Sequence, residues 1–226
     1  MNIVRFIAGY HTLESLVLVT EWISGGNLFQ KLIDEGKYSE SRVMFFFEQI
    51  CNALEFLHSK SIAHLDLRSE SLLLAANHRR LIIIGFGNAR EVQDDFLEPL
   101  DRAVPEFCSP EVASCMPVDC SSDVFSSGIL LYMLLTGESP FQGRTDKETL
   151  KNIQTNDHEK LKAEMKGKLS KTAQDLILQC LTHEAHKRPS ISEIAEDVST
   201  LEFSDENTIE SKKLKYFFTR QRFGQH

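Results

Sequence analysis

Basic residues are in short supply in this chain. Its 226 residues include 25 Lys and Arg against 33 Asp and Glu, which gives a formal net charge of −8. A domain that binds nucleic acid presents a basic surface to the phosphate backbone. The composition therefore argues against a nucleic-acid partner.

Long apolar runs are also absent. Apolar runs such as Leu72 to Ala76 and Leu81 to Ile84 are far shorter than the roughly 20 apolar residues that cross a bilayer. The N-terminus has no basic region followed by an apolar stretch, so we expect no signal peptide. No membrane partner is expected either.

Cysteines are few and scattered. The five of them, at positions 51, 108, 115, 120 and 180, form no Cys-x-x-Cys pair. An odd and scattered set disfavours both a disulfide framework and a zinc site, and it suits the reducing cytosol. We therefore expect a cytoplasmic protein with no bound metal.

Hydrophobic periodicity predicts a few strands followed by many helices. Val, Ile, Leu and Phe dominate two early runs, Ile3 to Ala8 and Leu16 to Trp22, and both are expected to be strands. Further strands are predicted at 72–74 and 81–84, and residues 87–112 look irregular. Apolar positions three and four residues apart predict helices at 28–34, 39–57, 124–135, 146–156, 170–181 and 192–201, with helices only from residue 122 onward. Because strands and helices do not alternate, a parallel doubly wound sheet is not expected.

The stretch from Ile62 to Gly87, IAHLDLRSESLLLAANHRRLIIIGFG, resembles the catalytic centre of a protein kinase. The kinase signature is H-R-D-L-x-x-x-N, followed by a strand and D-F-G. His64 and Asp66 hold their places in it. Ser71 stands where the signature has Asn, and Gly85 stands for the Asp of D-F-G. The frame of a phosphoryl-transfer site is present without its metal ligands.

Three later motifs follow in the order and spacing of the same family. Ser109-Pro110-Glu111 resembles A-P-E, the run from Asp123 to Gly128 resembles D-x-W-S-x-G, and Lys187-Arg188-Pro189 carries the Arg that pairs with the Glu of A-P-E in kinases. The resemblance implies structural roles for His64, Glu111, Asp123 and Arg188, with Asp123 capping a helix and tying down the catalytic loop. It also implies an α+β, mainly α, protein kinase-like fold, essentially the helical C-lobe with a two-strand remnant of the N-lobe.

The resemblance divides the chain into three parts. They are an N-lobe remnant and hinge at 1–23, a kinase-like C-lobe at 24–203 and a tail at 204–226. In the hinge, Thr20 falls at the gatekeeper position, and the backbone from Glu21 to Ile23 is where a kinase pairs with adenine. The phrase from Ser24 to Phe29 and the run from Leu135 to Phe141 resemble the calcium/calmodulin-type group, within it the myosin light chain kinases and the titin and obscurin kinases. That branch implies a cytoskeletal or sarcomeric location.

ATP and magnesium are the cofactors that the family implies, but their ligands are missing. Kinases hold two ions with the D-F-G Asp and the catalytic-loop Asn. Gly85 offers no side chain and Ser71 only a neutral hydroxyl, so we expect no cofactor. Asp66, at the position of the base, is then a relic. Arg68 takes the position of the catalytic-loop Lys. It keeps the positive charge, but its guanidinium is a planar fork and not a compact ammonium.

Further departures lie around this centre. Leu65 replaces the Arg that clamps a phosphorylated activation loop, and the segment from Gly85 to Cys108 contains no Ser, Thr or Tyr. Val104 replaces the Thr that bonds the catalytic Asp in Ser/Thr kinases. No Gly-rich loop, V-A-I-K lysine or helix-C glutamate precedes the first strand. We interpret the sequence as a partial gene product, with completion of the sheet by another segment as the alternative.

The tail changes character at its end. Residues 211–226 carry five bases and no acid. Leu214, Phe217 and Phe218 with these bases predict a basic amphipathic helix for calmodulin or for the domain's own groove. A solvated, disordered end is the other reading.

Two functions remain open. The sequence favours a degenerate Ser/Thr kinase-like domain that is catalytically inactive and binds a protein partner through its C-lobe, with a regulatory tail. The alternative is a weakly active Ser/Thr protein kinase in which Asp66 still serves as the base.

Overall fold

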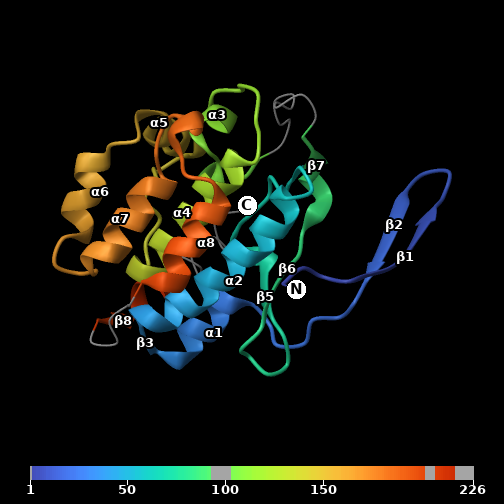
Figure 1. Ribbon diagram of the computed structural model, residues 1–226, viewed down its shortest axis with the longest axis horizontal. Coiled ribbons are helices and arrows are strands. Elements are labelled where there is room, and N and C mark those ends of the chain that lie inside the picture. Colours follow the sequence, from blue (N-terminus) through green and yellow to red (C-terminus); the bar gives the residue numbers. More distant parts are fainter. Residues whose placement is uncertain (1, 93–102, 202–206, 217–226) are drawn as a thin grey trace.

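The computed structural model describes residues 2–92, 103–201 and 207–216. Most of them form a helical lobe, and a β-hairpin extends away from it (Figure 1). The hairpin consists of β1 (Phe6–His11) and β2 (Leu16–Thr20), which pair antiparallel. Hydrogen bonds between Thr12 and Ser15 close its turn.

The first strand begins at Phe6 and ends at His11, so it starts and ends later in the chain than the apolar run from Ile3 to Ala8 predicts. Ile3 forms a bridge with Ile83 of the lobe, and Val4 N donates to the carbonyl of Ile83 at 3.0 Å. Residues 3 and 4 therefore extend the lobe, and the hairpin begins only after them.

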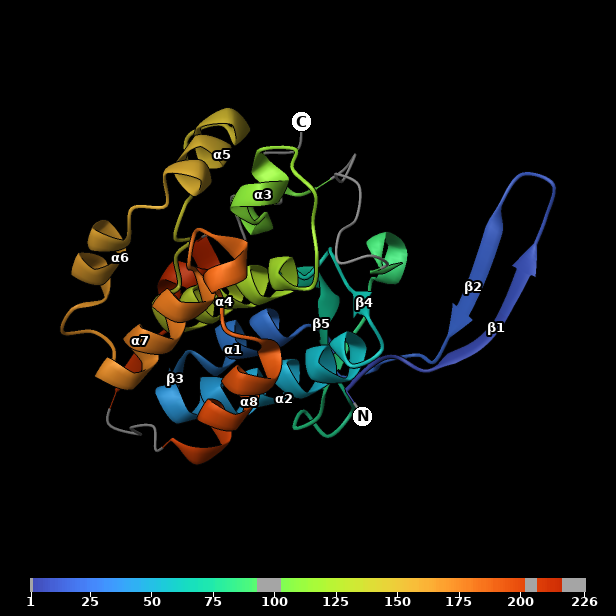
Figure 2. The same cartoon turned by 45° about the horizontal axis from the view of Figure 1, so that its top comes forward.

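Two long helices form the centre of the lobe, α2 (Glu40–His58) and α4 (Ser121–Thr136). Every residue of α4 from 122 to 135 is buried, as expected of a helix that is apolar all round. Gly128 allows α7 (Lys171–Cys180) to approach α4, because a Cβ at this position would lie 2.5 Å from the Cβ of Cys180. The helix α8 (Ile191–Thr200) packs alongside α2 (Figure 2).

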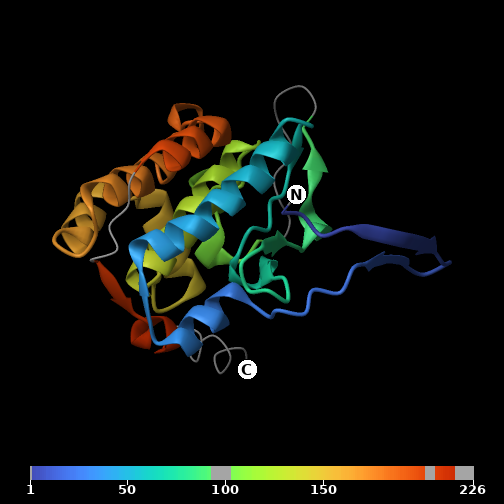
Figure 3. The ribbon, with the colours of Figure 1, turned by 60° about the horizontal axis from the view of Figure 1, so that its bottom comes forward.

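The remaining helices surround this centre (Figure 3). They are α1 (Leu28–Glu35), α3 (Pro110–Ala113), α5 (Asp146–Thr155) and α6 (His158–Met165), with 3₁₀ turns η1 (Ser69–Ser71), η2 (Phe86–Asn88), η3 (Pro105–Phe107) and η4 (Ala185–Lys187). The sequence did not predict α6, because only Leu161 and Met165 on it are buried and so short a stripe gives little periodicity. No helix in the described ranges has the length and apolar character needed to span a bilayer.

Three short antiparallel ribbons complete the lobe. The predicted one joins β5 (Leu72–Leu74) to β6 (Leu81–Ile83). The other two join β4 (Ile62–Ala63) to β7 (Arg90–Glu91) and β3 (Lys37–Ser39) to β8 (Thr208–Glu210). The strand β8 corrects the expectation that the chain is helical from residue 122 to its end. Strands of two or three residues are too short to show a period in the sequence.

The described part of the tail packs on the lobe. After β8, Ser211 Oγ donates to the carbonyl of Ile33 at the end of α1 (3.1 Å). Residues 212–216 are helical, and within them Leu214 is completely buried. Lys213 Nζ lies 2.8 Å from Glu138 Oε1. The tail is therefore docked up to residue 216, and the predicted contributions of Phe217 and Phe218 lie outside the described residues.

A buried carboxylate at the start of α2 connects three parts of the lobe. Glu40 is fully buried and accepts hydrogen bonds from both the backbone N–H and the hydroxyl of Ser170, the N-cap of α7. The side chain of Asn207, just before β8, donates to the same carboxylate at 3.3 Å. Glu40 thus links α2, α7 and the tail.

A buried ion pair closes the other side of the lobe. Arg188 lies 2.7 Å from both carboxylate oxygens of Glu111, so the contact is bidentate, and the same guanidinium donates to three backbone carbonyls. Burial opposes ionisation of Glu111, but the hydrogen bonds and charge of Arg188 hold the pKa of that carboxyl below its usual range. This pair joins α3 to the segment before α8.

We expect Arg188→Ala to lower the free energy of unfolding by about 3–5 kcal/mol, because it leaves a buried carboxylate without its cation. A folded-state pKa below the ordinary value means that the stabilisation is present above the ordinary Glu pKa and is lost as the pH falls. The deficit should therefore shrink below about pH 4. Urea unfolding at neutral and acidic pH measures both effects.

Lys187→Ala is the matched control. Lys187 pairs with Glu184 at 3.1 Å on the surface, where solvent screening leaves such a pair with little effect on stability. Equal losses in the two variants would contradict a structural role for the buried pair.

Candidate functional site

The segment 64–71, which joins β4 to β5, is fixed by the buried carboxylate of Asp123. This residue lies in the first turn of α4. Its oxygens accept hydrogen bonds from the backbone N–H groups of His64 (2.7 Å) and Leu65 (2.8 Å). These bonds hold Leu65 at φ 59, in the left-handed region that side chains with a Cβ seldom adopt. One carboxylate therefore sets the course of the segment.

Asp123 is ionised although it is completely buried. Burial raises the pKa, but the hydrogen bond and charge of His58, whose Nε2 lies 3.0 Å away, hold the pKa of Asp123 below its usual range. An ionised acceptor strengthens the two bonds to the backbone. Of the two roles that the sequence indicates for Asp123, the structure shows the anchoring of the segment 64–71. The N-cap of α4 is Cys120, so Asp123 does not cap the helix.

His64 connects this segment to the backbone just before Gly85. It is fully buried, and its Nε2 lies 3.0 Å from the carbonyl of Ile84, the residue before Gly85. Its Nδ1 accepts from the backbone N–H of Asp66 at 3.2 Å, which leaves the proton on Nε2. The ring also makes an edge contact with Phe86, with centroids 4.8 Å apart. Both ring nitrogens are engaged, so His64 supports the site and does no chemistry in it.

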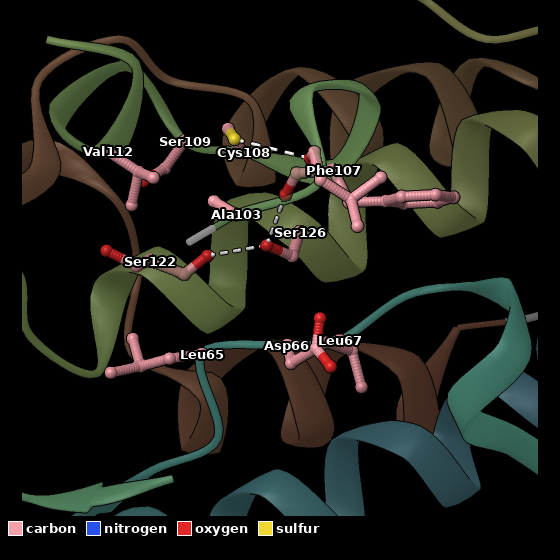
Figure 4. Close-up of a pocket in the computed structure, with 11 residues that line it drawn as sticks. Leu65, Asp66, Leu67, Ala103, Phe107, Cys108, Ser109, Val112, Ser122 and Ser126 are labelled. Atoms are coloured by element: carbon pink, nitrogen blue, oxygen red, sulfur yellow. Dashed lines mark hydrogen bonds between the residues drawn. The ribbon is translucent and has the colours of Figure 1, made fainter. Parts of the chain in front are cut away.

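Asp66 is placed where a base would act. Its side chain points into a cavity between the segment 64–71 and the segment 103–109 (Figure 4). Burial raises the pKa of Asp66, while the charge of Arg68, whose Nε lies 3.6 Å from Oδ1, opposes the rise. A raised pKa makes a carboxylate a better proton acceptor. The residue is thus able to accept a proton from a hydroxyl group brought next to it.

Val104, in the segment 103–109 across the cavity from Asp66, cannot form a hydrogen bond with the Asp66 carboxylate. The Val104 side chain lines the same cavity and has no hydrogen-bonding atom. Ser126 of α4 also lines the cavity, and its Oγ donates to the carbonyl of Phe107 at 2.8 Å, which ties the segment 103–109 to α4. The cavity measures about 20 Å³, which is room for about one water molecule.

Ser71 and Gly85, the two expected metal positions, face each other. A Cβ built on Gly85 would lie 3.7 Å from the Cβ of Ser71 and would meet no other side chain within 4 Å. Ser71 Oγ donates to the carbonyl of Arg68 (2.7 Å) and accepts from the N–H of Arg68 (3.0 Å). The hydroxyl closes its own turn, and Gly85 has no ligand atom. These residues do not fit a magnesium ion.

The hinge residues lie apart from Asp66. The backbone N–H of Glu21 donates to the carbonyl of Arg5 at 3.0 Å, and Thr20 is exposed on the hairpin. Neither these two nor Ile23 lines the cavity that contains Asp66. Among the described residues, no group of three or more His, Cys, Asp or Glu is arranged to hold a metal ion.

Two supporting residues escaped the sequence reasoning. Asn27 caps α1 through Oδ1, and its Nδ2 also donates to the carbonyl of Ser69 at 2.6 Å. His58 pairs with Asp123 from the end of α2, 65 positions earlier in the chain. Asn27 carried a local signal for one of its roles, whereas nothing near His58 in the sequence points to Asp123.

Known proteins match the chain over most of its length. Residues 1–198 match the model of the protein kinase domain family. Human death-associated protein kinase 2 is 34% identical over 195 residues, which cover 85% of this chain and 52% of that protein. Human myosin light chain kinase 2 is 38% identical over 154 residues, 67% of this chain and 26% of that protein. The chain thus spans about half or less of these relatives.

A solved structure agrees with the sequence match. The kinase region of twitchin from C. elegans superposes with a TM-score of 0.86 at 27% identity, covering 98% of this chain and 40% of that chain. The helix-rich fold expected from the motifs is therefore confirmed. The chain belongs to the protein kinase family, with homologues in the branch of the death-associated, myosin light chain and titin kinases.

Proposed function

We propose that this kinase domain is non-catalytic and serves as a protein-binding module. The observation that carries the proposal is the pair formed by Gly85 and Ser71. One position has no ligand atom, and the hydroxyl at the other is used by the backbone of Arg68. The domain keeps the shape of the catalytic segment without the groups that would neutralise phosphate charge.

The expected loss of rate is large. Phosphoryl transfer depends on metal ions that neutralise charge on the phosphates, since little covalent help is needed. Removing one preorganised electrostatic contact typically costs about 3 kcal/mol, a factor of a hundred or more in rate. A typical kinase turns over about 1–100 times per second, so two such losses leave little useful activity even when they do not add fully.

A weakly active Ser/Thr protein kinase is the second candidate function, and Asp66 favours it. Its carboxylate points into the cavity, the anchors on His64 and Leu65 are intact, and its pKa is raised. In this reading Asp66 accepts the proton of a substrate hydroxyl. It lacks the hydrogen bond that a Thr at position 104 would supply.

The partner-binding role rests on the helical lobe and on the tail. The lobe would offer a protein partner the surface around the cavity of Asp66, and the tail would regulate access to it. The docked residues 207–216 and the basic end beyond them support a tail that responds to calmodulin. A cytoplasmic, sarcomeric setting fits the muscle-kinase relatives.

The metal positions provide the first test. Gly85→Asp with Ser71→Asn restores both ligand types. The new Cβ at position 85 makes only an ordinary contact with the Cβ of residue 71, in a left-handed conformation that Asp tolerates. We expect Mg²⁺ with ATP to leave the Tm of the natural chain unchanged and to raise that of the double variant. A ligand at about 100 times its Kd adds about 2.7 kcal/mol. Fluorescence of Trp22, the single tryptophan, provides a second readout.

Gly87→Asp is the control for added charge, because a Cβ at that position meets no atom within 4 Å. An equal rise in Tm with Gly87→Asp would mean that charge alone causes the effect. A Mg²⁺-dependent rise in the natural chain would overturn the non-catalytic proposal.

Phosphotransfer itself separates the two candidate functions. We expect incorporation of labelled phosphate into a generic protein substrate to be at background level and unchanged by Asp66→Asn, because the metal ligands are absent. Glu70→Gln removes a neighbouring charge, 3.9 Å from Arg68, and serves as the matched control. Incorporation that Asp66→Asn abolishes and Glu70→Gln retains would establish the weak kinase instead.

The tail hypothesis has its own test. We expect calmodulin to capture the full chain in the presence of calcium and not in its absence. A chain ending at Glu210 should not be captured, because it lacks the basic end and the anchor Leu214. Capture of both chains, or of neither, would contradict a calmodulin-responsive tail.

A further inference from the structure

A cavity of about 460 Å³ lies where the docked tail meets the lobe. The lobe contributes the end of α4, the loop that follows it and α6, and the tail contributes its helical residues 212–216. The cavity shares no lining residue with the one that contains Asp66. Its volume falls in the range of sites that bind a ligand.

Three lysines line this cavity, Lys160 from α6 and Lys212 and Lys213 from the tail. The ammonium groups of Lys160 and Lys212 lie 3.8 Å and 3.6 Å from their carboxylate partners, Glu164 and Glu210. Both distances are longer than a hydrogen bond. The two ammonium groups therefore keep donors for a further anion.

The carboxylates of the cavity are engaged more closely than these lysines. Glu164 accepts from the hydroxyl of Tyr132 at 2.9 Å, and Glu138 lies 2.8 Å from Lys213. Ser139 also lines the cavity, and its buried hydroxyl has no hydrogen-bond partner among the described residues. The lining thus combines satisfied acids with loosely paired cations and an unused hydroxyl, which favours an anionic group.

Tyr216 can carry such a group in the cavity itself. It lies on the tail helix four residues after Lys212 and three after Lys213, and these spacings place the three side chains on one face. Tyr216 lines the cavity and is 72% exposed. Its hydroxyl is therefore open to a modifying enzyme and belongs to the same surface as the lysines.

The other three tyrosines of the chain lack this combination. Tyr38 and Tyr132 are buried, and their hydroxyls donate to the carbonyl of Leu134 and to Glu164. Tyr10 is exposed, but it lies on β1, which contains no Lys or Arg. Of the four, Tyr216 joins an accessible hydroxyl to a cluster of lysines.

We propose that Tyr216 is a phosphorylation site and that its phosphate fastens the tail to the lobe. A separate protein tyrosine kinase supplies the group from ATP. The phenol oxygen forms a bond to the γ-phosphorus, the bond from that phosphorus to the β–γ bridging oxygen breaks, ADP leaves, and the phenol proton passes to the base of that enzyme. The step is independent of any phosphotransfer by this domain.

The phosphate brings a charge of about −1.5 to −2 and three acceptor oxygens into the cavity. Lys212 and Lys213 lie beside it on the same helix, and Lys160 receives it from the lobe. The contact with Lys160 is the one that joins the tail to α6.

Incubation of the full chain with a protein tyrosine kinase of broad specificity and ATP tests the site. We expect one phosphate per chain, located on Tyr216 by mass spectrometry of peptides. Tyr216→Phe should remove it, and Tyr10→Phe, which changes the other exposed tyrosine, should leave it in place. Phosphate on Tyr10 and none on Tyr216 would overturn the assignment of the site, as would a chain that takes up none.

Hydrogen exchange measures the fastening. The amide of Ser211 donates to the carbonyl of Gly36 at 3.0 Å and so reports whether the tail is docked. Phosphorylation should slow exchange in residues 207–216 about tenfold, the factor expected of one net charge-assisted hydrogen bond. Lys160→Ala should abolish this slowing. Lys162→Ala is the matched control, because Lys162 lies on the same helix, pairs with Glu159 at 2.7 Å and does not line the cavity.

Three outcomes would contradict the fastening. Faster exchange after phosphorylation would mean that Glu138 and Glu164 repel the phosphate and release the tail. Equal slowing in Lys160→Ala and in the natural chain would place the phosphate contact elsewhere. Inorganic phosphate added to the unmodified chain should leave exchange unchanged, and an equal slowing would assign the cavity to a free anion instead.

Discussion

The buried carboxylate of Asp123 is the interaction on which the site depends. It sits at the start of α4, the most deeply buried helix, and its oxygens hold the backbone at His64 and Leu65. From there His64 reaches the carbonyl of Ile84, so the course of the chain at Gly85 is also determined from within the core. All of these contacts are made by groups that bind neither metal nor nucleotide. The shape of the segment is therefore independent of the chemistry that kinases perform there.

This independence explains how a kinase domain can lose its ligands and keep its architecture. Ser71 gives the clearest example, since its hydroxyl joins the backbone of Arg68 and closes the turn that places the following strand. Glu111 and Arg188 connect distant parts of the lobe in the same way. Side chains that hold the fold, such as Glu111 and Arg188, can therefore persist whether or not the metal positions keep their ligands.

Much of this architecture could be predicted from short-range signals. The run of apolar residues in α4, the N-cap at Ser39 and the H-x-D motif each depend on neighbours in the sequence. What could not be predicted depends on distance along the chain. The pairing of β3 with β8, the contact of His58 with Asp123 and the second role of Asn27 join residues that the sequence separates widely. Whether Ser71 has a free hydroxyl is likewise a question of geometry that the residue type alone leaves open.

The buried Glu40 affects how the protein folds while the ribosome synthesises it. Its partners Ser170 and Asn207 lie 130 and 167 positions further along the chain. Ribosomes deliver the N-terminal part first, at about 5–20 residues per second. The first turn of α2 therefore waits many seconds for the groups that complete it. Until then the Glu40 side chain must remain hydrated, which keeps this end of the nascent lobe open until the start of α7 and the tail emerge.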